Sequence, residues 1–236
     1  NLVNIFFKFK IIDFNIIIDG TRSRGGSAGA YAMQRFTSIP FKTTFGNLRI
    51  SDVVPIFTRE KRDEVNEGGS LDSGVPEAMD DGTWLMDWLD TDVADSVSSR
   101  ATYSNSVPFK LAHAPKDSDG ILQPAIHHFR GKMVAFFVPR RGSHLDQFAS
   151  IIKDNSIGYI IGMTAGGYSN TWEWEETIKF PGTDQPVVQF MWDIGHTIRP
   201  NGEILEGNPA LPDELFPLTR NNFDIYYQEL VRKAME

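Results

Sequence analysis

The pattern of apolar residues predicts alternating strands and helices in the first and last parts of the chain. A continuous apolar run at 14–20, ending in Asp-Gly, is typical of a central strand covered on both faces of a sheet. It leads through two glycines into a helical stretch of small residues. The order returns with a strand at 132–138, a glycine turn, a helix ending near Asp154 and a strand at 157–163. This order predicts an α/β sheet.

The middle of the chain, about 45–128, has a different character. Its first part is polar and acidic, and its last part is loop-like. Between them, 81–97 predicts a helix whose apolar face holds Trp84, Leu85, Trp88 and Leu89. We interpret 45–128 as a long insertion that elaborates the domain or covers its edge.

The C-terminal part predicts antiparallel strands and a closing helix. Apolar and acidic residues alternate with period two over 171–180, and 185–202 has the composition of strands. The chain then ends in an amphipathic helix. The apolar face expected for this helix holds Phe223, Tyr226, Leu230 and Val231.

Composition narrows the function. The 236 residues are 41% hydrophobic, which is enough for a substantial core, and their formal charge of -8 argues against a nucleic-acid partner. The chain has no cysteine, which excludes disulfides, thiolate zinc sites and a cysteine nucleophile. Lys8, Lys10 and Asp13 interrupt the apolar N-terminal residues, so we expect no membrane span there.

Two turns could carry chemistry. Gly25-Gly26 follows a predicted strand, so it could form a tight turn before a helix, or it could point backbone N–H groups into an oxyanion site. Ser143 stands where a helix begins. Its hydroxyl could cap that helix, or it could be a nucleophile beside the N–H of His144 at the positive end of the helix. Taken alone, neither turn decides between these readings.

Three motifs in order carry a more specific signal. They are IIIDGTRSRGG at 16–26, GSHLDQFASIIKDNSIGYIIGMTAGG at 142–167 and EGNPALPD at 206–213. Together they resemble the signature blocks of the tail-specific, or C-terminal processing, serine peptidases, in the branch of the tricorn core protease and the chlamydial protease-like activity factor. This resemblance implies a ClpP/crotonase-like α/β fold, a mixed sheet flanked by helices, with one catalytic domain over 1–236.

The resemblance also implies a role for individual residues. Ser143 falls on the nucleophile, Gly26 on the glycine whose N–H forms half of the oxyanion hole, and the N–H of His144 would supply the other half. Some members pair the serine with a lysine, but the matching position here is Tyr168. This favours the Ser-His-Glu branch, in which Glu206 would orient the histidine. Glu203 is the neighbouring candidate.

In tricorn-type proteins the catalytic histidine lies far upstream of the first motif. The histidines of this chain that match no family position are His113, His127, His128 and His196. We therefore expect the chain to be a fragment that lacks the N-terminal segment supplying the histidine, and to be inactive alone. The first motif also departs from the family pattern, with Thr21 at the arginine position and Ser23 in place of asparagine.

The predicted function is thus a serine endopeptidase acting on peptide or protein substrates. The resemblance implies no cofactor, implies export to the periplasm or beyond, and is compatible with a homodimer. Two alternatives stay open: a non-catalytic peptide-binding relative without the histidine, and a crotonase-type acyl-CoA enzyme with a glycine-rich oxyanion hole. The aspartates between 80 and 95 lack calcium-loop spacing, so no metal is assigned.

Overall fold

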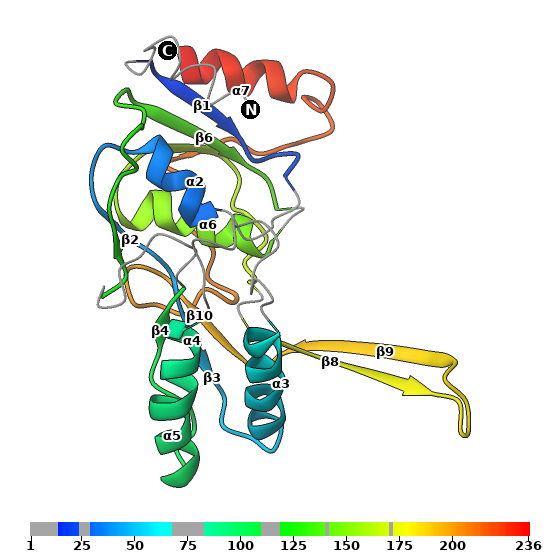
Figure 1. Ribbon diagram of the computed structural model, residues 1–236. Coiled ribbons are helices and arrows are strands. Elements are labelled where there is room, and N and C mark those ends of the chain that lie inside the picture. Colours follow the sequence, from blue (N-terminus) through cyan, green and yellow to red (C-terminus); the bar gives the residue numbers. More distant parts are fainter. Residues whose placement is uncertain (1–13, 24–28, 68–82, 110–118, 140–141, 170–171) are drawn as a thin grey trace.

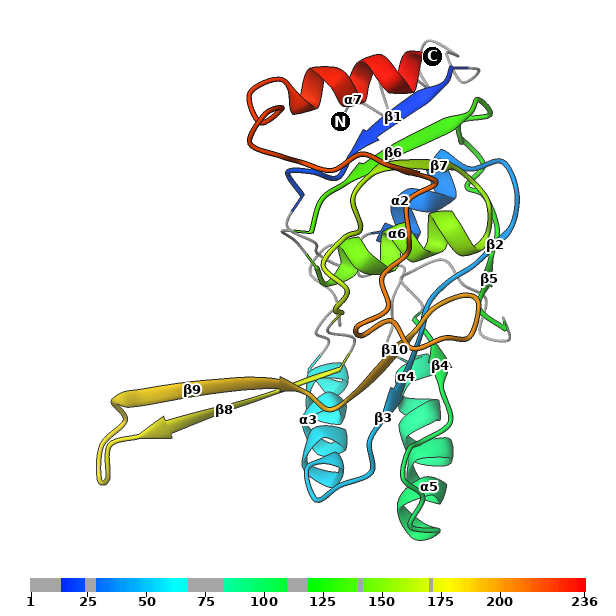
Figure 2. The ribbon, with the colours of Figure 1, turned by 180° about the vertical axis from the view of Figure 1, so that it is seen from behind.

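A computed structural model describes residues 14–23, 29–67, 83–109, 119–139, 142–169 and 172–236 (Figure 1). One part of the molecule contains a sheet with helices on both sides. A second part holds the helices of the middle segment, and a long hairpin extends from it. Figure 2 shows the same arrangement from behind.

The main sheet has four described strands in the order β1-β6-β7-β11, and every neighbouring pair is parallel. The strands are β1 (Ile16–Asp19), β6 (Met133–Phe137), β7 (Tyr159–Gly162) and β11 (Glu214–Leu215). The predicted α/β sheet is confirmed, but these strands form a parallel rather than a mixed sheet. The antiparallel pairs lie in separate small sheets.

Helices cover both faces of this sheet because side chains alternate along β6. Met133, Ala135 and Phe137 belong to the core that includes α2 (Gly29–Phe36) and α6 (His144–Asp154). Phe136 packs instead with Tyr226 and Leu230 of α7 (Tyr226–Met235). The position predicted for α7 is confirmed except for Phe223, which precedes the helix and is 62% exposed.

The strand predicted at 14–20 is present as β1. Among the described strands it neighbours β6 alone. Ile16 and Ile18 pack on the core, whereas Ile17 is 44% exposed. Within the described residues, the core therefore covers one face of this strand.

The middle segment packs around a core of its own. Here β3 (Phe45–Leu48) pairs antiparallel with β4 (Val107–Pro108) and with β10 (Gly195–Ile198) from later in the chain. The second core contains Leu48, Val54, Phe57, Leu85, Trp88, Leu89, Val93, Val107, Trp172 and Ile194. Two further short strands, β2 (Phe41–Lys42) and β5 (Ile121–Leu122), pair with each other. The limits of the insertion, 45–128, stay a prediction.

The helices of this segment are α3 (Val54–Asn66) and a run of three helical pieces: α4 (Thr83–Trp88), the π-helical η2 (Leu89–Val93) and α5 (Ala94–Ser98). The run confirms the helix predicted at 81–97 over the described residues, with Leu85, Trp88 and Leu89 buried. None of the described helices is long and apolar enough to cross a bilayer.

The predicted antiparallel strands form the hairpin of β8 (Glu173–Lys179) and β9 (Pro186–Asp193). Trp172 anchors its base, since this side chain is buried and stacks on Trp88 with ring centroids 5.4 Å apart. The rest of the hairpin extends away from the body in both views (Figures 1 and 2).

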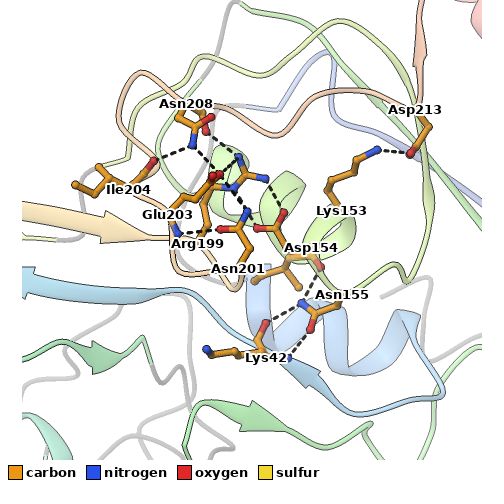
Figure 3. Close-up of polar contacts among 11 residues, drawn as sticks. Lys42, Lys153, Asp154, Asn155, Arg199, Asn201, Glu203, Ile204, Asn208 and Asp213 are labelled. Carbon is orange, nitrogen blue, oxygen red and sulfur yellow. Dashed lines mark hydrogen bonds and ion pairs between the residues drawn. The ribbon is translucent and has the colours of Figure 1, made fainter.

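A buried ion pair joins the C-terminal end of α6 to the turn after β10 (Figure 3). The Arg199 guanidinium donates Nε and Nη2 to the two carboxylate oxygens of Asp154, at 3.0 and 2.5 Å, and donates Nη1 to the carbonyl of Asn208 at 3.1 Å. The two charged side chains are 7% and 4% exposed. This pair fixes the turn of residues 199–208 relative to α6.

Replacing Arg199 should therefore be costly. Arg199→Ala leaves the Asp154 carboxylate buried without its partner, so we expect a loss of about 3–5 kcal/mol in the free energy of unfolding, measured by urea titration. The matched control is Arg62→Ala, because Arg62 and Asp90 pair while about half exposed. That change should cost less than about 1 kcal/mol. Equal losses in the two variants would show that the Arg199 pair does not hold this turn.

Candidate active site

Ser143 occupies an unusual backbone position between β6 and α6. Its φ is 61° and its ψ is -139°, a combination that non-glycine residues rarely adopt. A Cβ on Gly142 would come within 2.4 Å of the Tyr168 ring, so any other residue there would require this half-exposed ring to move. The Ser143 N–H donates to the Tyr168 carbonyl at 2.8 Å. This hydrogen bond ties the strained turn to the glycine turn after β7.

The reading of Ser143 as a side-chain helix cap is wrong. Ser143 stands at the cap position, but its hydroxyl makes no capping hydrogen bond to α6. The N–H of Asp146 is bound instead by the Ser143 carbonyl at 2.9 Å. The side chain of Ser143 is half-buried, so its Oγ stands at the beginning of the helix without the ordinary structural task of a serine there.

Asp146 links the turn of Ser143 to the glycine turn after β7. Its carboxylate is 1% exposed and accepts the N–H groups of Gly167 at 2.9 Å and Tyr168 at 3.4 Å. The Gly167 carbonyl in turn accepts the N–H of Gly207 at 2.7 Å. One buried carboxylate therefore positions the peptide that touches Ser143 and, through the same turn, the segment that carries Glu206.

Burial raises the pKa of Asp146 from 3.8 to about 6. The N–H groups of the glycine turn oppose this rise, and the nearby negative charge of Glu206 adds to it. Glu206 also raises the pKa of Asp193, after the larger effect of lost hydration. Glu206 thus lies close enough to Asp146 and to Asp193 to repel each of them.

Glu206 lies in the turn after β10. Both of its carboxylate oxygens accept the N–H of Thr197, at 3.1 and 3.2 Å. The flanking Leu205 is fully buried, and Gly207 has a φ of 76°, which glycine adopts without strain. The Glu206 side chain is half-buried and is held by the backbone N–H of Thr197. The next residue, Gly207, is bound to the glycine turn.

Glu203, the neighbouring candidate, is engaged elsewhere (Figure 3). Its carboxylate accepts the side-chain amides of Asn208 at 3.0 Å and Asn201 at 3.2 Å, and it lies 3.8 Å from Arg199. These amides lower the pKa of Glu203. No contact described here connects Glu203 to the glycine turn, so the geometry favours Glu206.

A buried polar chain beside the site could not be predicted from the sequence. Thr44 donates its hydroxyl to Gln147 Oε1 at 2.7 Å, and Gln147 donates its amide to Ser169 Oγ at 2.6 Å. All three side chains are buried. The only signal in the sequence was Gln147, a polar residue in a helix that is otherwise rich in apolar residues. A buried amide needs hydrogen-bond partners, but the sequence does not identify them.

The remaining predicted site residues are placed as follows. Gly26 lies outside the described residues. The His144 imidazole is buried, packs on Phe109 with ring centroids 5.6 Å apart, and lies so close to Gly29 that a Cβ there would approach it to 2.3 Å. The rings of His196 and Tyr103 are tilted by 33° with their centroids 4.9 Å apart, and His128 Nδ1 lies 2.7 Å from the Ala125 carbonyl. In the described part of the chain, none of these contacts joins an imidazole to Ser143 or Glu206.

No group of three or more His, Asp or Glu side chains in the described ranges is arranged to hold an ion.

The strain at Ser143 should be measurable. Glycine adopts positive φ without a Cβ clash, so we expect Ser143→Gly to be more stable than Ser143→Ala by about 1 kcal/mol. Ala94 in the exposed part of α5 provides the control, because Ala94→Gly should lose about 1 kcal/mol at an ordinary helical position. Thermal unfolding of the variants would test this. A glycine that destabilises both positions alike would refute strain at Ser143.

The Asp146 carboxyl should make stability depend on pH. Its pKa is higher in the folded than in the unfolded protein, so its contribution is full below pH about 4 and is lost as the pH rises through about 6. The loss at neutral pH is roughly 3 kcal/mol relative to a group whose pKa does not shift. Unfolding curves of the wild type and Asp146→Asn, taken from pH 4 to 7, should therefore diverge. Glu206→Gln should move the midpoint to lower pH, and parallel curves would contradict the assignment.

Comparison with known proteins supports the fold. No protein-family model and no curated protein matches the chain. Among solved structures, mature CPAF, the chlamydial protease-like activity factor, has a TM-score of 0.70 at 18% identity, over 98% of this chain and 45% of that one. CPAF complexed with lactacystin gives 0.68 at 16% identity, over 98% and 44%.

A putative peptidase from Parabacteroides merdae is also similar, with a TM-score of 0.57 at 13% identity, over 99% of this chain and 54% of that one. The chain thus spans less than half of the CPAF chains and about half of the other peptidase. The resemblance predicted from the three motifs is confirmed by the structural comparison, because this chain folds like part of CPAF.

Proposed function

We propose that this chain carries the nucleophile and the orienting carboxylate of a serine endopeptidase. The observation that carries the proposal is the strained backbone of Ser143 at the start of α6, tied through one glycine turn to the segment of Glu206. Strained non-glycine backbone persists where the surroundings hold it firmly, and such places concentrate at functional sites. The fold shared with CPAF supports the same reading.

In this mechanism, Ser143 Oγ attacks the carbonyl carbon of a peptide bond. A histidine takes the hydroxyl proton as the bond forms and then donates it to the leaving amine. Water hydrolyses the resulting acyl-serine by the same sequence of proton transfers. Glu206 orients the histidine and stabilises its imidazolium. The repulsion of Glu206 by Asp146 and by Asp193 favours this role, because a positive charge beside Glu206 relieves it.

The oxyanion of the tetrahedral intermediate would accept the N–H groups of His144 and Gly26. The first of these opens α6, where the helix dipole favours negative charge. For the second, the assignment to Gly26 rests on the resemblance of the first motif. A ClpP/crotonase-like architecture and a tail-specific activity are the finer forms of the same proposal.

The histidine would come from a segment outside this chain. A fluorophosphonate probe tests this, because it reacts with a serine activated by a neighbouring base. We expect intact-protein mass spectrometry to show one label on Ser143 when the chain is expressed together with the preceding segment of its gene, and slow labelling of the chain alone that imidazole accelerates. Ser143→Ala should abolish the label, whereas Ser156→Ala, at another serine of positive φ, should leave it.

Two further variants separate the carboxylates. Glu206→Gln should slow labelling by several orders of magnitude, by analogy with the loss of the orienting acid in a catalytic triad. Glu203→Gln should leave the rate almost unchanged, since that side chain belongs to the Asn201 and Asn208 network. An unlabelled Ser143 in a protein that carries the histidine would overturn the peptidase.

The second candidate is a non-catalytic peptide-binding relative. The observation in its favour is that the contacts given above for His128 and His196 are with Ala125 and Tyr103 rather than with Ser143. The crotonase-type acyl-CoA enzyme does not require a serine at a strained helix start, and the Ser143 backbone therefore argues against it.

A further inference from the structure

A cavity lies at the C-terminal end of α2, against the loop that follows β5. Its volume is about 410 Å³, within the range of small-molecule sites, and it is lined by Gln34, Arg35 and residues 123–127. The other end of α2 begins at Gly29, beside the His144 ring. Arg35 lies about 9 Å further along the helix axis. The cavity is therefore separate from the site around Ser143.

Hydrogen bonds between the helix and the loop hold the walls of this cavity. The carbonyls of Gln34 and Arg35 accept the N–H groups of Ala125 at 2.7 Å and Phe129 at 2.8 Å. The side-chain amide of Gln34 donates to the Gln123 carbonyl at 2.8 Å. Carbonyls in the last turn of a helix lack partners within the helix, so the loop satisfies them and weakens the negative end of the helix dipole. The cavity is thus a fixed feature of the fold.

One buried polar atom beside the cavity has no partner among the described residues. The Gln34 side chain is 4% exposed. Its Nε2 binds Gln123, but within the described part of the chain its Oε1 accepts no hydrogen bond. Nearly all buried polar atoms in folded proteins are hydrogen-bonded, so this oxygen requires a donor. Because Gln34 lines the cavity, a bound molecule can supply that donor as an N–H group.

Arg35 supplies a positive charge to the same cavity. Its Nη2 donates to the Tyr31 hydroxyl at 3.0 Å, and its guanidinium lies 5.2 Å from the centre of the Tyr31 ring. No carboxylate of the described residues lies within ion-pair distance of Arg35. A guanidinium has five N–H donors and binds a carboxylate well through two of them. A single guanidinium also matches the single charge of a carboxylate better than the double charge of a phosphate.

The rim of the cavity is apolar. Pro124, Ala125 and Ile126 line it, and Ile126 is 93% exposed, the largest exposed fraction among the exposed large apolar residues of the described ranges. An apolar group of a ligand would shield Ile126 from water, which favours binding. None of the residues that line the cavity is acidic, so the cavity offers no partner for an ammonium group.

We propose that this cavity binds an N-acylated apolar amino acid with a free carboxylate. Arg35 binds the carboxylate, Gln34 Oε1 accepts the amide N–H, and Ile126 contacts the apolar side chain. Gln34 and Arg35 are adjacent in α2, so the groups that they bind must be close together in the ligand. In an amino acid only the α-carbon separates the carboxylate from the nitrogen. The acyl group is required because a free ammonium would find no acidic partner.

Titration of the chain with N-acetylleucine, followed by NMR of the ligand, tests the proposal. We expect a dissociation constant of about 1 mM, which is ordinary for a ligand of this size. Two analogues each remove one group while the protein stays unchanged. N-acetylleucinamide lacks the carboxylate, and the acetylated hydroxy acid that corresponds to leucine lacks the amide N–H. Each should bind at least about fivefold more weakly.

Variants of the chain locate the site. Arg35→Gln should weaken the binding of N-acetylleucine about tenfold. Arg130→Gln, at an exposed arginine that does not line the cavity, should change it less than about twofold. Ile126→Ser should weaken it at least about threefold, whereas Ile178→Ser on the β8–β9 hairpin should leave it unchanged. Thermal unfolding of each variant checks that the fold remains intact.

An acetylated tripeptide that ends in leucine identifies the source of the ligand. Binding at least as tight as that of N-acetylleucine would assign the cavity to the ends of peptides, and weaker binding would assign it to free N-acyl amino acids. The proposal is overturned if N-acetylleucine does not bind at about 10 mM, or if N-acetylleucinamide binds equally well. Equal effects of Arg35→Gln and Arg130→Gln would also overturn it. Since no arm involves Ser143, these outcomes are independent of the peptidase proposal.

Discussion

The candidate site depends on the buried carboxylate of Asp146. At the first turn of α6 it accepts N–H groups from the glycine turn after β7, which also binds Ser143 and the segment of Glu206. Without a carboxylate there, these donors would be buried without acceptors, and each would cost about 1–3 kcal/mol. Burial of this carboxylate raises the pKa of Asp146, so at neutral pH its charged form lowers the stability of the fold. The site thus accepts a local loss of stability in return for positioning the glycine turn, as functional sites commonly do.

The C-terminal end of α6 is also held by buried polar contacts. Asp154 pairs with Arg199, and Asn155 binds both the backbone N–H and the carbonyl of Lys42 (Figure 3). The helix is therefore tied to the turn of Glu206 from its C-terminal end and, through Gly167, from its N-terminal end. The glycine turn after β7 and the turn of residues 199–208 therefore keep a fixed separation, because the eleven residues of α6 lie between their attachment points at Asp146 and Asp154.

The sequence predicted those features that local patterns determine. The apolar run of β6, the helix that ends near Asp154 and the period-two alternation of β8 each appeared where expected. Other features depend on which segments meet. The edge position of β1 follows from strand order, and the chain from Thr44 through Gln147 to Ser169 joins residues far apart in sequence. The rare backbone of Ser143 likewise comes with a hydrogen bond from its N–H to Tyr168, a residue distant in sequence.

The β8–β9 hairpin is attached to the second core and not to the main sheet. Trp172, at the foot of β8, is wedged between Phe57 and Trp88, so its neighbours belong to α3 and α4 and not to the strands beneath Ser143. The base of the hairpin is thus anchored in the middle segment. A substitution at Trp172 would therefore act first on α3 and α4, and not directly on the strands beneath Ser143.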